Sequence, residues 1–163
     1  MRVLSSILLV LFVSGASNAS AQTRGASIDS TADYQLQIYA WHVRLISERS
    51  DLTAICRTPA HIYACTDFIG ARLDCHCEQA AMKWRLTARA QFIPFLSLWD
   101  IRTLFHEGLH IGDVRIGVIE HLKHLTSHRF ETSDACEGFA RRSSDEFLKE
   151  MNAIMVRSNE HRN

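Results

Sequence analysis

The chain has 163 residues, which is enough for one domain and little more. Its 18 lysine and arginine side chains balance 18 aspartate and glutamate side chains. This balance gives no electrostatic reason to expect binding to nucleic acid or to an anionic lipid surface, so we expect no nucleic-acid partner.

The first segment in chain order, residues 1–21, has the pattern of a signal peptide. Arg2 supplies a positive charge, an apolar run extends from Val3 to Val13, and small residues end the segment at Ala19-Ser20-Ala21. The run is shorter than the roughly 20 apolar residues that span a bilayer, which favours cleavage after Ala21 over a membrane anchor. We therefore predict a secreted or periplasmic protein with no stable membrane span after cleavage.

The next part of the chain gives weaker signals. Residues 22–33 are small and polar, and they predict a flexible leader. Tyr34 to Leu45 places apolar residues at both helical and strand spacings, so its element type stays open. From Ala54 to Gln79, short segments alternate with loop residues, which predicts strands with turns near Thr58-Pro59 and Gly70.

All five cysteines follow the predicted signal peptide, and export would place them in an oxidising compartment. The short spacing of Cys56 and Cys65 favours a local disulfide between them. Cys136 is distant from the others, and either Cys75 or Cys77 is its expected partner, which leaves one cysteine free. The competing interpretation is a zinc site at Cys75-His76-Cys77, but C-x-C ligation is less common than C-x-x-C.

Lys83 to Phe92 is the clearest strand, because apolar and polar residues alternate along it. This pattern predicts one buried and one solvated face. We expect Pro94 to end the strand. Ser97 can then cap a helix, with Asp100 in a capping-box position.

The apolar spacing predicts a helix from Trp99 to His128. Gly112 and Gly117 each weaken it by about 1 kcal/mol relative to alanine, so a straight helix and a helix bent at these glycines are both open. A second helix is predicted to begin at the cap signal Thr132-Ser133-Asp134 and to continue to about Arg157.

These elements predict an α+β fold within a single domain that covers residues 34–163. A small antiparallel strand region would be followed by a long hairpin of two helices.

The first helix carries His106-Glu107-Gly108-Leu109-His110, an H-E-x-x-H motif. Residues four apart share a helix face, so His106 and His110 can each place an imidazole nitrogen about 2.0–2.1 Å from one zinc ion. Glu107 is rotated by about 100° around the helix axis and can reach a water molecule on the metal without binding the metal. Zinc lowers the pKa of such a water towards about 7, and Glu107 would be the general base.

The order of strand, proline, tryptophan and H-E-x-x-H helix resembles the zincin metallopeptidase plan. More narrowly, the chain resembles a family of small exported bacterial proteins of unknown function that are predicted to be zinc-dependent proteases. The resemblance covers roughly Cys75 to the end of the chain and is carried by Cys77, residues 83–92, Pro94, Trp99, residues 106–110 and Cys136. It implies a zincin-like domain with Zn²⁺ as cofactor, a peptide or protein substrate and a Cys77–Cys136 disulfide. The metzincin pattern does not fit, because Asp113 and Ile116 stand where its glycine and third histidine belong.

A catalytic zinc site needs a third protein ligand, and the sequence leaves several candidates: Asp113, Glu131, Glu137, Glu150 and His161. If the first helix bends at its glycines and turns back, Glu137 or Glu131 can reach the motif. If both helices run straight, residues 150–155 lie level with the motif, and Glu150 or His161 can reach it. The resemblance favours this second register, because the family looks to carry a histidine near the chain end. Asp113 shares a helix face with His106 and can either bind the metal or hold a ligand histidine.

Together these observations predict an exported zinc-dependent peptidase, with His106 and His110 as ligands and Glu107 as the general base. One alternative is a non-catalytic, zinc-stabilised envelope or binding protein. The other is a periplasmic metal-binding protein that uses the wider histidine stripe of His121, His124 and His128. Neither the substrate nor the oligomeric state is indicated by the sequence.

Overall fold

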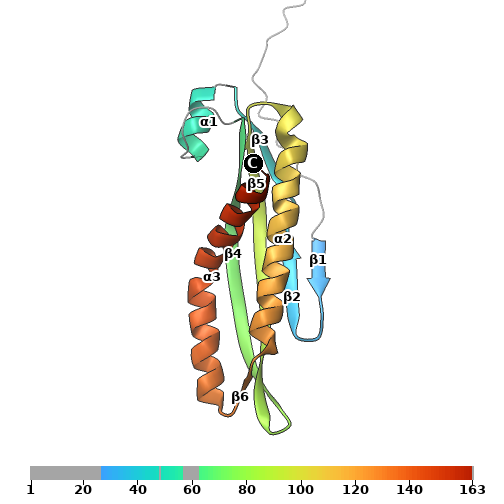
Figure 1. The fold of residues 1–163 in the computed structure, drawn as a ribbon, viewed down its shortest axis with the longest axis vertical. Coiled ribbons are helices and arrows are strands. Elements are labelled where there is room, and N and C mark those ends of the chain that lie inside the picture. The colour runs from blue at the N-terminus through green and yellow to red at the C-terminus, as the bar shows by residue number, and fades with distance from the viewer. Residues whose placement is uncertain (1–26, 48, 57–62, 163) are drawn as a thin grey trace, which may run out of the picture.

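Two long antiparallel strands form the centre of the fold (Figure 1). The structure, a computed structural model, describes residues 27–47, 49–56 and 63–162. The strands β4 (Ala64–Ala80) and β5 (Lys83–Leu98) are joined at Ala81-Met82 and pair from this turn to the far end of β5. The predicted signal peptide, residues 1–21, lies outside the described residues.

Three short strands share the other edge of β5. They are β6 (Arg129–Phe130) at its beginning, β2 (Tyr34–Ile38) in its middle and β3 (His42–Leu45) at its end. β2 and β3 are consecutive pieces of one extended path along this edge, so they have the same direction. Both run parallel to β5. The purely antiparallel sheet expected from the sequence is therefore wrong.

The predicted flexible leader, residues 22–33, contains a strand. β1 (Ser27–Ser30) pairs with β2 in antiparallel orientation, while residues 22–26 lie outside the described part. The bidentate contact of Asp29 with Arg115, at 2.7 and 2.8 Å, ties this strand to the helix layer. The polar composition of the segment gave no sign of this strand, because the strand forms only by hydrogen bonding to β2.

Pro94 lies inside β5 and does not end it, contrary to the expectation from the sequence. The backbone N–H of Tyr39 donates to the carbonyl of Phe92, so Phe92 and, two residues later, Pro94 direct their backbone groups towards the edge shared by β2 and β3. The register of β2 ends at Phe92 and that of β3 begins at Phe95. The missing N–H of the proline falls between two edge strands, where it breaks no ladder hydrogen bond.

β4 likewise continues through the turn expected near Gly70. Gly70 has a φ of 63°, and the register with β5 shifts between Ile69 and Arg72, which marks a β-bulge. Glycine adopts this left-handed conformation without steric cost, so the strand is distorted there but does not reverse. The turn expected at Thr58-Pro59 lies outside the described residues.

A short helix and two disulfides complete the strand region. α1 (Arg49–Cys56) replaces the beginning of the predicted strands, and Cys56 forms a disulfide with Cys65 in β4, as its spacing predicted. The second disulfide joins Cys77 to Cys136, and Cys75 is the free cysteine. Because Cys77 is oxidised, the alternative zinc site at Cys75-His76-Cys77 is excluded.

Two long helices, α2 (Leu104–Ser127) and α3 (Ser133–Arg162), lie on one face of the sheet (Figure 1). The mixed α+β class and the long first helix are thus confirmed. The predicted cap is wrong, because Ser97 is buried within β5. Asp100 instead caps a short 3₁₀ helix (Ile101–Thr103) that leads into α2, and its side chain accepts a hydrogen bond from a backbone N–H there.

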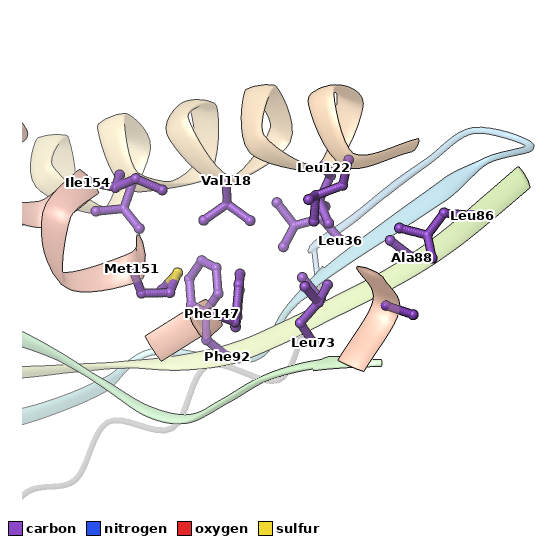
Figure 2. Close-up of a cluster of buried hydrophobic side chains, with 14 of the residues drawn as sticks. Leu36, Leu73, Leu86, Ala88, Phe92, Val118, Leu122, Phe147, Met151 and Ile154 are labelled. Carbon is purple, nitrogen blue, oxygen red and sulfur yellow. The ribbon is translucent and has the colours of Figure 1, made fainter. Parts of the chain in front are cut away.

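The main core lies between the sheet and the two long helices (Figure 2). α2 is one unbroken element, so the bend considered at Gly112 and Gly117 does not occur. Gly117 has a packing role instead, because a Cβ atom there would lie 2.6 Å from Cγ2 of Ile154 on α3. Large buried side chains fill this layer: Leu36, Phe92, Val118, Leu122, Phe147, Met151 and Ile154.

Candidate metal site

His106 and His110 lie one turn apart near the beginning of α2 and converge through their outer ring nitrogens. The two Nε2 atoms are 3.0 Å apart, and the ring planes are nearly perpendicular, at 87°. Two nitrogens bound to one zinc ion in tetrahedral geometry, at about 2.0–2.1 Å each, lie about 3.3 Å apart. The spacing of the two nitrogens therefore fits a shared metal ion with little movement of either ring.

Glu107 stands beside this pair and is almost fully buried, with 6% of its surface exposed. The Thr66 hydroxyl, from β4, donates a hydrogen bond of 2.6 Å to its Oε2 atom. The ligand atoms of Glu107, His106 and His110 all lie within 4.8 Å of one another. Within the described part of the chain this is the one group of three such side chains that could hold a metal ion.

A second, smaller core packs the beginning of α2, which carries the motif, against the sheet. Ile111 packs there with Leu96 and Leu98 of β5, and Trp41 covers the edge of the cluster. Gly108, inside the motif, faces the Trp41 ring, and a Cβ atom there would lie 3.4 Å from it. An added Cβ at Gly108 would thus make an ordinary van der Waals contact with the indole, which places this turn of α2 directly against Trp41.

The inner histidine is held from its other side. The Nδ1 atom of His110 lies 2.9 Å from the Ser158 hydroxyl oxygen, and that hydroxyl donates a hydrogen bond of 3.0 Å to Oδ2 of Asp113. Ser158 belongs to α3, whereas the other two belong to α2. His110 and Ser158 are both buried, and His106 is exposed. The structure thus gives Asp113 a supporting position behind one of the two candidate ligand histidines.

Two of the other candidate third ligands, Glu137 and Glu150, are not brought to the histidine pair. Glu137 accepts a hydrogen bond from Ser133 at the beginning of α3. Glu150 forms an ion pair with Arg157 and lines a pocket together with His121, further along α2. The side chain of His161 lies outside the described residues, although its backbone belongs to α3.

The register of the two helices differs from the expected one by one turn or more. Straight helices were expected to place residues 150–155 level with the motif. Instead Ile154 faces Gly117, and Ser158 is the residue that faces His110. Sequence reasoning missed Ser158 for this reason. It also missed Thr66, for which no sequence signal exists, because its position depends on the alignment of β4 with the helix layer.

The wider histidine stripe is spread along α2 and does not converge on the motif. His121 is tilted against Phe147, with ring centroids 6.3 Å apart, and lines a pocket of about 370 Å³ together with His124 and Glu150. Burial lowers the pKa of His121. His128 contacts Phe139, and its Nδ1 atom bonds the helix end at the His124 carbonyl. These three histidines therefore have local partners of their own.

Comparisons of this chain with protein-family models, with curated proteins and with solved structures gave no match.

Proposed function

We propose that this protein is an exported zinc-dependent peptidase whose centre is the group of His106, Glu107 and His110. The observation that carries the proposal is the approach of the two Nε2 atoms to 3.0 Å beside a buried carboxylate. Two neutral imidazoles and a carboxylate are a donor set that zinc commonly binds in proteins. His106 and His110 would hold the ion.

When bound, a zinc ion would supply Lewis acidity, which polarises a carbonyl group and acidifies water. Glu107 would accept a proton from the attacking water molecule and return it to the nitrogen of the leaving amine. The water oxygen forms a bond to the carbonyl carbon, and the C–N bond of the peptide breaks. The Thr66 hydroxyl, bonded to Oε2, would hold the carboxylate in one orientation during both proton transfers.

Exposed apolar side chains that precede the motif in the chain support a peptide substrate. Phe105 directly precedes His106 and is 78% exposed, and Ile101 is exposed one turn earlier. Trp99 and Tyr63 form an exposed aromatic pair with ring centroids 5.7 Å apart. Exposed apolar surface of this kind next to a reactive group favours contact with the side chains of a bound chain.

The compartment is supported by the cysteines. The two disulfides indicate an oxidising environment outside the cytoplasm. Among the described residues, none of the helices combines the length and apolar character needed to cross a membrane. Cleavage of residues 1–21 as a signal peptide belongs to the proposal, since those residues are not described.

One observation favours a second candidate function, a non-catalytic protein stabilised by zinc. Glu107 is buried and already accepts a short hydrogen bond from Thr66, which is also how a structural carboxylate ligand is held. In that case Glu107 would bind the metal directly, and the site would have no general base. The two functions therefore differ in what Glu107 contributes.

The test is zinc content and peptide cleavage of the purified protein, measured with a broad library of fluorogenic peptides. The peptidase proposal expects one zinc ion per chain and chelator-sensitive cleavage. His110→Ala should lose both, Glu107→Gln should keep the metal and lose cleavage, and the exposed control His76→Ala should change neither. If His161 is the third ligand, His161→Ala should lose both zinc and cleavage in the same assay.

Three results would contradict the peptidase. Zinc loss in Glu107→Gln, together with no cleavage by the wild type, would indicate the structural role. Several weakly bound ions that survive His110→Ala would indicate the histidine stripe as a metal store. A wild type that holds no zinc, even after zinc is supplied, would contradict zinc as the cofactor of the motif.

A further inference from the structure

The contact between His110 and α3 determines which ring nitrogen of this histidine carries a proton. Ser158 has a single hydroxyl proton, and that proton points to Oδ2 of Asp113 at 3.0 Å. A carboxylate can only accept such a bond. The Ser158 oxygen must therefore accept its second hydrogen bond, at 2.9 Å, from the N–H at Nδ1 of His110.

This assignment has a consequence for the opposite side of the ring. With the proton of a neutral imidazole fixed on Nδ1, the lone pair of His110 is on Nε2, which is the atom that faces His106. A metal ion needs this lone pair. In proteins, histidine ligands are commonly oriented by a partner of the other ring nitrogen, and loss of that partner typically weakens metal binding by about 10–100-fold.

We propose that Ser158, held by Asp113, is a positioning residue that keeps Nε2 of His110 ready for a metal ion, so that metal binding and the docking of the last turns of α3 on α2 strengthen each other. The inference rests on the proposed metal binding and not on peptide cleavage. It assigns a role to the end of α3 that the H-E-x-x-H motif does not contain.

The packing around Ser158 supports the link to α3. Ser158 is only 4% exposed, and Ile154, one turn earlier, is seated against Gly117 with no space for an added Cβ. This part of α3 thus contacts α2 through the apolar packing of Ile154 and through the two hydrogen bonds of Ser158. A ligand that binds His110 in its docked form must stabilise that form by linkage.

The experiment titrates the full-length folded protein with Co²⁺ and follows the visible absorption of the bound ion, with Zn²⁺ competition for affinity. Ser158→Ala should weaken binding by about 10–100-fold and alter the absorption of bound Co²⁺. Ser158→Thr keeps the hydroxyl and should lie closer to the wild type. Ser143→Ala is the matched control, because it is the same change on α3 about 22 Å away along the helix, and it should leave affinity unchanged.

A second variant keeps the test decisive if Ser158→Ala does not fold. In Asp113→Asn the new amide can donate to Ser158, which frees the hydroxyl to donate to Nδ1 and favours the wrong tautomer. Metal affinity should fall here too. Hydrogen exchange adds an independent readout, because Co²⁺ should slow exchange of the amides of residues 150–158 in the wild type and not in Ser158→Ala.

The outcomes separate this inference from the proposed function. If the wild type binds one Co²⁺ and both Ser158→Ala and Asp113→Asn bind it equally well, the positioning role is overturned while the metal site stands. Unchanged exchange of α3 on metal binding would overturn the coupling. If the wild type binds no metal, the proposed function itself fails.

Discussion

Two of the three glycines of α2, Gly112 and Gly117, offer a matched pair of substitutions that tests the packing of the helices. At Gly112 an added Cβ meets nothing within 4 Å, whereas at Gly117 it would lie 2.6 Å from Cγ2 of Ile154. Alanine improves intrinsic helix propensity over glycine by roughly 1 kcal/mol at either position. Gly112→Ala should therefore raise the free energy of unfolding by up to about 1 kcal/mol, which corresponds to about 2–4 °C in Tm for a chain of this size.

Gly117→Ala receives the same propensity gain but overpacks the helix contact. Forcing extra volume into a packed interior costs about 1–3 kcal/mol, and Ile154 is buried and cannot swing into solvent. The net effect should range from nearly neutral to a loss of about 2 kcal/mol after the gain of about 1 kcal/mol is deducted. The two variants should thus differ by about 1–3 kcal/mol in urea denaturation, although their chemistry is identical.

A double-mutant cycle with Ile154→Ala isolates the close contact. In the wild-type background this truncation should cost about 2–5 kcal/mol. In the Gly117→Ala background it also relieves the overpacking, so its cost should fall by about 1–3 kcal/mol. Equal stabilisation by both glycine variants, with no coupling to Ile154→Ala, would refute the close approach of α2 and α3 at this point.

Three further predictions concern single side chains. Thr66→Val removes the donor to the buried Glu107 carboxylate and should lower the free energy of unfolding by about 1.5–3 kcal/mol in urea titrations. Burial raises the pKa of the Cys75 thiol, so its alkylation by iodoacetamide at pH 8 should be much slower in the folded than in the urea-unfolded protein. Burial lowers the pKa of His121 below its usual 6.5 despite the nearby Glu150. Because the unfolded chain then binds the proton more tightly, stability should fall as pH drops below about 6.5, and His121→Gln should remove that part of the pH dependence.

Each of these predictions has a result that would contradict it. For Thr66 the control is Thr87→Val, whose hydroxyl hydrogen bond is exposed, and equal effects of the two changes would argue against a buried ion contact. Equal alkylation rates of the folded and unfolded protein would show that the Cys75 thiol is accessible and ionisable. An unchanged pH profile in His121→Gln would show that this imidazole titrates as it does in the unfolded chain.

The features that could be predicted from the sequence are those set by short-range geometry. Helical periodicity predicted most of α2, and spacing alone placed His106 and His110 on one face. The nine-residue separation of Cys56 and Cys65 was enough to predict their disulfide. Alternation predicted the first part of β5, in which each residue's environment follows from its own strand.

The errors arose where distant segments decide the outcome. Proline normally ends a strand because it lacks a ladder donor, yet Pro94 is harmless where β2 and β3 leave a gap. The parallel pairing of these strands was invisible because nothing in a single strand records the direction of its partner. A helix register likewise depends on side-chain packing, and here it brings Ile154 against Gly117.

The identity of a third metal ligand also depends on how distant segments pack and not on local spacing. Asp113 is turned towards Ser158, Glu150 is paired with Arg157, and Glu137 lies about 31 Å from Ser158 along α3 at 1.5 Å per residue. Within the described side chains, Glu107 is then the one further donor within reach of the two histidines. Position 161 is three residues beyond Ser158 in α3, towards the end of α2 that carries His106. If His161 binds the metal, Glu107 is left free to act as a base. If none of the residues outside the described side chains binds it, Glu107 is the described donor that can complete the site, and it loses that role. The choice between peptidase and structural zinc protein therefore depends on whether a residue such as His161, 54 positions beyond Glu107 in the sequence, supplies a ligand.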